Sequence, residues 1–328
     1  MAAKQAPTGR KPRTRTGGTA PASPERDAGR RKEGARPDKA TPRPPARPAK
    51  GGAGPRGSRP ESSHKAAPAP GKGLAPGHDE EVLYGRHAVM EALAARRRHV
   101  RRIYVAEGVE RSAILTRIVS TAQLIGCPVL EVPRQRLDEA APANHQGVVA
   151  QADAYPYVEL DDLLAPPGEG QDAPLYLALD HLQDVQNLGV LLRTAEAVKV
   201  TGVILPGRRS AGVTPAVVNA SAGAVEHLKI ALVGNLVQAL ATLKDEGVWV
   251  VGLDAAPQAT PLAEARLIGP LALVVGAEGE GLSRLARERC DWLVAIPMLG
   301  KVDSLNAAVA GSVVLVQARQ ARPLRGSV

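Results

Sequence analysis

The sequence contains no phenylalanine, and its 328 residues include only five tyrosines and two tryptophans. Because proteins that stack RNA bases need exposed aromatic platforms, this scarcity argues against recognition by stacking. The two cysteines, Cys127 and Cys290, stand far apart and outside any CxxC spacing, which argues against a disulfide framework or a metal site and predicts reduced thiols. Apolar runs fall short of the roughly 20 residues that cross a bilayer, and the N-terminus shows no signal-peptide core. We therefore expect a soluble, cytoplasmic protein that uses neither a membrane nor a metal.

Positive charge is concentrated at the start of the chain. Residues 1–80 hold 18 Lys and Arg against 7 Asp and Glu, whereas the remainder holds 24 against 26. The same stretch has 14 prolines and 12 glycines but few large apolar residues, so it cannot offset its ordering entropy and is predicted to be disordered. Because arginine recurs throughout it, we favour a polycation that raises affinity for nucleic acid over a solubilising spacer. A mitochondrial or plastid presequence fits less well, because the stretch lacks helical amphipathicity.

Residues 81–156 are predicted to form a small α/β domain. Its expected helices cover 84–95, 114–125 and 136–140, and its expected strands cover 103–105, 128–132 and 148–150. The run 96–102 carries five arginines and a histidine and is either a solvated helix end or a phosphate contact. A lone histidine such as His145 is more often structural than catalytic.

A linker is expected over 157–172, followed by a second α/β domain over 173–328. Strands and helices alternate in this domain, which is typical of a parallel sheet covered by helices. Strands are expected over 175–180, 202–206, 228–232, 248–254, 271–275 and 293–296, with helices beginning at Asn187, after Pro215, at Asn235 and at Ser304. The final helix is predicted to be capped by Ser304 and to bury one apolar face, made of Leu305, Ala308, Val309, Val313 and Val316.

Two of these strands end in irregular loops. The strand over 271–275 runs into Gly276-Ala277-Glu278-Gly279-Glu280-Gly281, and the strand over 293–296 stops at Pro297. We expect the two strands to be neighbours, with a small-ligand site at their ends. The glycine spacing differs from the G-x-G-x-x-G dinucleotide motif, and Gly300-Lys301 lacks the Ser or Thr of a P-loop. Both nucleotide-binding interpretations are therefore disfavoured.

In the helix expected from Asn187, Arg193 points away from the buried apolar stripe. An i,i+3 ion pair with Glu196 on the surface would be enough to explain an arginine at this position. Asn187 is explained equally simply as a cap for the first amides of the helix.

The second domain resembles the SpoU (TrmH) family of RNA 2′-O-ribose methyltransferases, within the SPOUT superfamily. The resemblance is carried by three motifs: Asn187-x-Gly189-x-x-x-Arg193-Thr194, the glycine loop 276–281, and Ile296-Pro297-Met298-x-Gly300 through Ser304-Leu305-Asn306-x-x-Val309-Ala310. The first domain, which ends in Asn144-His145-Gln146-Gly147-Val148-Val149-Ala150, is similar to the L30e-like RNA-binding domain of many members. Within the family the chain resembles the bacterial 23S rRNA guanosine-2′-O-methyltransferases that act on the peptidyl-transferase loop. The long tail departs from the short form of that subfamily and leaves the target nucleotide open.

This resemblance implies a parallel sheet with a C-terminal trefoil knot, S-adenosylmethionine as cofactor, and a homodimer whose sites use residues from both chains. It assigns the cofactor pocket to Gly276, Ile296, Met298, Gly300 and Leu305. It assigns catalysis to Arg193, with Asn187, Glu278, Ser304 and Asn306 around it.

The expected reaction is in-line attack of a ribose 2′-hydroxyl on a sulfonium methyl group, in which positioning supplies much of the rate. Because a guanidinium rarely gives up its proton, we favour Arg193 as a stabiliser of the developing alkoxide, with proton removal by Arg193 as the alternative. Glu278 either orients Asn187 or Arg193, or is a structural carboxylate that caps loop amides. The rival functions are a tRNA 2′-O-methyltransferase of the same family and a non-catalytic RNA-binding protein acting in ribosome assembly or antibiotic resistance.

Overall fold

A computed structural model describes residues 79–164, 172–208 and 210–322. The tail predicted to be disordered lies outside this part of the chain, apart from its last two residues. In the N-terminal region the strands are β1 (Glu80–Tyr84), β2 (Val100–Ala106), β3 (Val129–Val132) and β4 (Val148–Asp153), and the helices are α1 (Arg86–Ala95), α2 (Ala113–Leu124), α3 (Arg134–Ala140) and the short 3₁₀ helix η1 (Ala143–His145).

This N-terminal region is built on a four-stranded sheet in the order β1-β4-β2-β3. Strand β4 pairs antiparallel with β1 and β2, and β2 pairs parallel with β3. The helix predicted from Tyr84 in fact begins at Arg86, because Tyr84 ends strand β1 and Gly85 turns the chain with a φ of 93°. The prediction missed β1 because its sequence, Glu-Glu-Val-Leu-Tyr, shows no alternation of apolar and polar residues.

The C-terminal region contains a seven-stranded sheet in the order β7-β6-β5-β10-β8-β11-β9, with every pairing parallel. The strands are β5 (Leu175–Asp180), β6 (Gly202–Pro206), β7 (Ile230–Val233), β8 (Trp249–Leu253), β9 (Thr260–Pro261), β10 (Leu271–Gly276) and β11 (Trp292–Ala295). The helices are α4 (Leu160–Leu163), α5 (Val185–Ala197), α6 (Pro215–Ala220), η2 (Ala224–His227), α7 (Leu236–Asp245), η3 (Leu262–Glu264), α8 (Arg284–Arg289) and α9 (Ala307–Gln320). The predicted parallel α/β architecture is confirmed, but β10 and β11 are not neighbours, because β8 lies between them.

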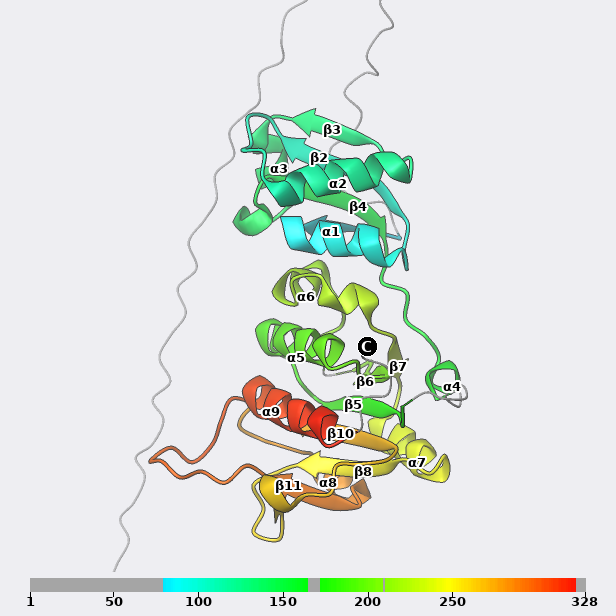
Figure 1. The fold of residues 1–328 in the computed structure, drawn as a ribbon, viewed down its shortest axis with the longest axis vertical. Coiled ribbons are helices and arrows are strands. Elements are labelled where there is room, and N and C mark those ends of the chain that lie inside the picture. The colour runs from blue at the N-terminus through cyan, green and yellow to red at the C-terminus, as the bar shows by residue number, and fades with distance from the viewer. Residues whose placement is uncertain (1–78, 165–171, 209, 323–328) are drawn as a thin grey trace, which may run out of the picture. The chain divides into compact units, whose positions relative to one another are not determined.

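Helices cover both faces of this sheet (Figure 1). Alternate residues of β5 point to opposite sides: Leu177 and Leu179 pack with α5, α6 and α9, whereas Tyr176 and Ala178 pack with α7 and α8. Helices α5 and α9 lie against each other, and Thr194 Oγ1 is 2.9 Å from Ser312 Oγ across their contact. The helix that carries Arg193 is therefore on the same face of the sheet as the final helix.

Two predictions about the final helix are wrong. It begins at Ala307 and is capped by Asn306, whose Oδ1 accepts the N–H groups of Ala308 and Val309 at 2.9 and 3.2 Å, so Ser304 is not its cap. Of the face predicted to be buried, only Ala308 is buried, whereas the larger members Leu305, Val309, Val313 and Val316 are exposed. The buried stripe includes Gly311, where an added Cβ would lie 2.7 Å from Leu191 Cδ2. Because α9 lies so close to α5, the face of α9 that is buried is the one that contains Gly311.

The basic run 96–102 is not simply a solvated helix end. Arg98 is 6% exposed and forms ion pairs with buried Glu226 and, at 2.6 Å, with Glu81. Arg97 donates to the carbonyl oxygens of Leu228 and Pro156. Two of the five arginines therefore hold the N-terminal region against the 3₁₀ helix η2 and the residues that follow it.

Candidate active site

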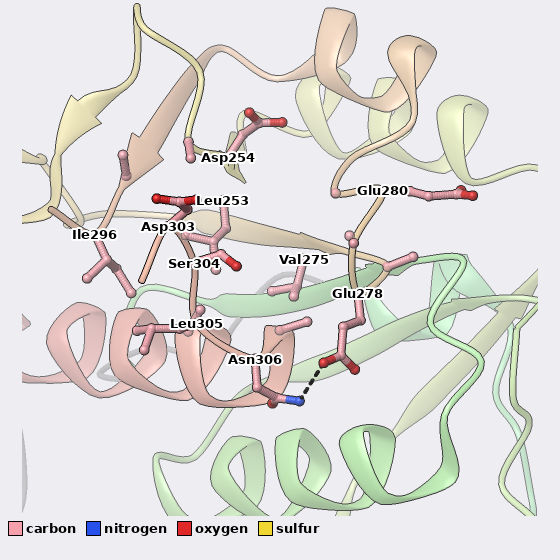
Figure 2. A pocket seen from close by; sticks show the side chains of 18 of the residues that line it. Leu253, Asp254, Val275, Glu278, Glu280, Ile296, Asp303, Ser304, Leu305 and Asn306 are labelled. Atoms are coloured by element: carbon pink, nitrogen blue, oxygen red, sulfur yellow. Dashed lines mark hydrogen bonds between the residues drawn. The ribbon is translucent and has the colours of Figure 1, made fainter. Parts of the chain in front are cut away.

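The main pocket, with a volume of about 640 Å³, opens at the carboxyl edge of the large sheet. It is formed by the ends of β8, β10 and β11, by the loops after them, and by the start of α9 (Figure 2). The carboxyl ends of parallel strands meet at one edge of a sheet, which is where open α/β folds bind ligands. The volume lies in the range of small-molecule sites.

The glycine loop forms one wall of this pocket as a tight reversal. Ala277 and Gly281 exchange two backbone hydrogen bonds, of 3.1 and 2.9 Å. Gly279 and Gly281 have φ values of 82° and 67°, which side chains with a Cβ rarely adopt. At Gly276 an added Cβ would lie 2.2 Å from the carbonyl group of Gly281, so the loop folds back directly over this residue. Glycine is required here by close backbone approach.

Three side chains from separate parts of the chain meet beside the loop. Asn187 Nδ2 donates to Glu278 Oε2 at 2.7 Å, and Asn306 Nδ2 donates to Asn187 Oδ1 at 2.8 Å and to Glu278 Oε1 at 3.3 Å. Figure 2 shows the last of these bonds, with Glu278 turned toward Asn306. Each of the three recognised motifs contributes one member, so the network joins them in space.

Asn187 does not cap its helix, contrary to the structural explanation offered above. Helix α5 begins at Val185, and the cap is Asp184, whose Oδ1 accepts the N–H of Asn187 at 2.7 Å. The side chain of Asn187 is left free to bond Glu278, and the residue is 8% exposed. Glu278 is accordingly placed to orient Asn187, the first of its two predicted roles.

Most of the predicted site residues lie in or beside the pocket. Its lining includes Gly276, Glu278, Ile296, Met298, Ser304, Leu305 and Asn306. Gly300 lies two residues beyond Met298 but is not among the residues that line the pocket. Asn187 stands behind the wall and reaches it through Glu278 and Asn306.

Arg193 is the predicted site residue that lies apart. Its side chain is exposed, as its helical position predicted, and it does not line the pocket of its own chain. Among the described residues it forms no hydrogen bond or ion pair, so the expected pair with Glu196 is not formed. It is six positions after Asn187 on α5, about 9 Å along the helix axis.

The sequence interpretation missed an acidic part of the lining. Asp254 follows β8 and pairs with Arg287 of α8, with Nε and Nη2 at 2.9 and 2.7 Å from Oδ2. It was missed because β8 was not expected between β10 and β11; an Asp at the end of a buried strand was the available signal. The lining also holds Asp303, Glu278 and Glu280, so it contains four carboxylates and one guanidinium, that of Arg287. Such a lining favours a ligand with positive charge and disfavours polyphosphates.

Comparison with known proteins identifies the family of this chain. The model of the SpoU rRNA Methylase family matches residues 174–316, and the model for RNA 2′-O ribose methyltransferase substrate binding matches residues 82–158. The putative TrmH family tRNA/rRNA methyltransferase YacO of Bacillus subtilis is 41% identical over 244 residues, which cover 74% of this chain and 96% of the relative. This chain belongs to the SpoU (TrmH) family of RNA methyltransferases.

Solved structures agree with the family's fold. The AdoMet-bound rRNA methyltransferase from Sinorhizobium meliloti is 26% identical, with a TM-score of 0.61 over 74% of this chain and 87% of that one. The SpoU methyltransferase AviRb from Streptomyces viridochromogenes, at 24% identity, matches in fold with the same TM-score of 0.61. The predicted enzyme class and α/β fold of this SpoU-family methyltransferase are thus confirmed, while its trefoil knot stays a prediction. None of its described helices combines the length and apolarity needed to cross a bilayer.

Proposed function

We propose that this SpoU-family enzyme transfers a methyl group from S-adenosylmethionine to the 2′-hydroxyl of a guanosine in 23S rRNA, in the peptidyl-transferase loop. The observation that carries the proposal is the network of Asn187, Glu278 and Asn306, which brings the three motifs together at one pocket. The domain matched by the family's substrate-binding model, residues 82–158, is assigned to the RNA.

The residues of the pocket fit the cofactor. S-adenosylmethionine carries positive charge on its sulfonium and amino groups, and the lining offers an excess of carboxylates. Ile296, Met298 and Leu305 supply apolar surface, and the bare backbone at Gly276 lets a ligand approach closely. When bound, S-adenosylmethionine supplies an electrophilic methyl group. The same cofactor is present in the Sinorhizobium meliloti relative, whose crystal structure is described as AdoMet-bound.

The protein's own contribution is positioning and charge. Asn187 and Asn306 fix the Glu278 carboxylate, and Asn306 at the same time caps α9, so the helix start and the glycine loop are held together. A guanidinium close to the attacking oxygen would stabilise negative charge that develops there. We assign that role to Arg193, rather than proton removal, because a guanidinium seldom releases its proton.

Arg193 reaches a pocket most simply from a second copy of the chain. Val190, one turn before it on α5, is 43% exposed, and α9, which packs against α5, exposes Val309, Val313 and Val316. Contiguous exposed apolar side chains mark interaction surfaces. We therefore propose a symmetric homodimer over α5 and α9, in which Arg193 completes the partner's site.

The decisive experiment is to map methylated riboses in RNA from a strain that lacks this protein. A 2′-O-methyl group protects the adjacent phosphodiester from alkaline cleavage, so the lost modification appears as a newly cleaved position. Loss of one guanosine methylation in 23S rRNA supports the proposal. Loss in tRNA instead would support the tRNA alternative, and an unchanged pattern together with RNA binding would support a non-catalytic role.

A further inference from the structure

The loop between α3 and β4 exposes the side chain of Gln146, which has no role in the proposed reaction. The residue before it, His145, anchors the loop. His145 is fully buried, its Nδ1 accepts the N–H of Gly147 at 3.0 Å, and its Nε2 lies 2.8 Å from Asp138 Oδ1. Both nitrogens therefore have partners inside the protein, and His145 is the structural anchor of the loop. The residue that follows it, Gln146, is exposed.

Gln146 is held in a conformation that costs energy for any side chain. Its φ is 53°, in the left-handed region, and Gly147 follows with a φ of 77°. Arg86 fixes it there, because its Nε donates to the Gln146 carbonyl oxygen at 3.1 Å while its Nη1 donates to Ser112 Oγ at 2.8 Å. Glycine would adopt this backbone without strain. A strained residue whose surroundings over-determine it points to a use for the side chain.

The side-chain amide of Gln146 has hydrogen-bonding capacity to spare. It makes no hydrogen bond within the described residues, although it offers two donor hydrogens and an acceptor oxygen. That set matches the edge of an unpaired nucleobase, which proteins read in single-stranded RNA. The aromatic side chains of this region, Tyr84, Tyr104 and Tyr155, are all buried. The described part of residues 79–156 therefore has no exposed tyrosine ring on which a base could stack, and we expect it to recognise a base through hydrogen bonds.

The loop is also tied to the methyltransferase region. Asn144, two residues before Gln146, donates to Asn219 Oδ1 at 2.9 Å, and Asn219 Nδ2 donates to the carbonyl oxygen of Tyr84 at 3.1 Å. Asn219 belongs to α6, which packs closely on α5 where an added Cβ at Gly189 would lie 2.4 Å from Ala220. A short chain of contacts thus runs from the Gln146 loop to the helix that carries Asn187.

We propose that Gln146 is a specificity-determining residue that hydrogen-bonds an unpaired base of the substrate RNA. His145, Arg86 and Gly147 hold the loop so that the amide faces solvent at a fixed place. The inference rests on the proposed function, in that it takes the ligand of residues 82–158 to be the RNA that is methylated. It adds the residue and the kind of contact through which a base is read.

The test uses the full chain and two substitutions. Gln146→Gly removes the amide and relieves the backbone, and Gln146→Asn keeps an amide but shortens its reach by one carbon. The control is Gln123→Ala, which removes an exposed glutamine of α2 from the same region. Filter binding would measure the dissociation constant for rRNA isolated from a strain lacking the protein. Methyl transfer to the same RNA would give its KM, and thermal melting would report stability.

We expect both Gln146 variants to bind the RNA about tenfold more weakly, with kcat at saturating RNA within twofold of wild type and the Gln123→Ala control unchanged. Gln146→Gly should melt no lower than wild type. RNA affinity within twofold of wild type in both variants would overturn the inference. A lowered melting temperature in Gln146→Gly would also overturn it, because the residue would then be structural. Absence of methyl transfer by the wild type would count against the proposed function, while the binding measurement would still decide the role of Gln146.

Discussion

The side-chain amide of Asn187 lies 2.7 Å from Glu278 Oε2 and donates to it, although 91 residues separate the two in the chain. This bond fastens the first turn of α5 to the glycine loop after β10. The bond orients the Glu278 carboxylate from directly behind the pocket wall. A substitution that changes the charge of Asn187 but not its size should therefore disturb the site.

Asn187→Asp should therefore reduce methyl transfer sharply. The substitution puts a second carboxylate beside Glu278 in a nearly buried position, where repulsion and a lost hydrogen bond together cost about 1–3 kcal/mol. A fall of about 10- to 100-fold in kcat/KM is expected at constant fold. The control is Gln238→Glu, which adds the same charge to an exposed position on α7. Equal activity of the two variants would show that the Asn187–Glu278 bond does not support the reaction.

The proposed homodimer predicts complementation between two inactive variants. Arg193→Ala removes the residue given to the partner's site, and Glu278→Ala disables the pocket itself. Mixed dimers would contain one site with neither change, so random exchange of subunits should restore about a quarter of wild-type activity. Refolding the two variants together and assaying labelled methyl transfer measures this. No gain over the separate variants would place Arg193 in the site of its own chain or outside catalysis.

Buried charge makes the contact between Arg98 and Glu226 sensitive to substitution. Glu226→Gln leaves the guanidinium of Arg98 buried with a single carboxylate partner, Glu81, and should lower the free energy of unfolding by about 3 kcal/mol. The matched control is Glu288→Gln, which breaks the exposed pair with Arg284 and should change it by less than about 1 kcal/mol. Urea denaturation of both variants compares the two losses. Similar values for the buried and the exposed pair would contradict this account of the basic run.

The thiol of Cys290 should be unreactive in the folded protein. Burial, assisted by the nearby carboxylate of Asp291, raises its pKa from 9.0 to about 12, and the thiolate is the reactive form. A pKa raised in the folded state means that this group favours folding below about pH 9, and that its contribution is lost as the pH rises from 9 toward 12. Alkylation at pH 8, followed by mass spectrometry, should label Cys290 only in denaturant. Rapid labelling of the native protein would show that the site is open.

The sequence predicted the elements better than their arrangement. Alternating apolar runs and helical spacing identified the buried strands of the large sheet, because those signals are local. Strand order is not local: β8 enters between β10 and β11 through pairings over tens of residues, so Asp254 escaped notice. The motifs nevertheless contain Glu278 and Asn306, which both line the pocket because the loops that carry them follow strands of one parallel sheet. Their assignment to catalysis stays a prediction.

Errors at helix faces and caps have a common physical cause. Val309 and Val313 share an apolar stripe with Ala308, but packing distance rather than hydrophobicity decided which side of α9 is buried, through Gly311. Asn306 rather than Ser304 caps that helix, because its side chain serves the cap and Glu278 together. The run that contains Arg98 was expected to be a solvated helix end or a phosphate contact, but Arg98 pairs with buried Glu226 from a distant segment. Each of these features depends on a tertiary contact, which the spacing of residues in the sequence does not reveal.

The central claim is that the pocket beside the glycine loop holds S-adenosylmethionine, and titration calorimetry of the full chain tests it most directly. Wild type should bind one molecule of S-adenosylmethionine per chain. Gly276→Ala should abolish binding, because the added Cβ would lie 2.2 Å from the backbone of Gly281 and displace the loop. A Cβ added at Gly234 would have open space around it, so Gly234→Ala is the matched control and should bind S-adenosylmethionine as wild type does. Absence of heat from the wild type, or equal binding by Gly276→Ala, would contradict the account.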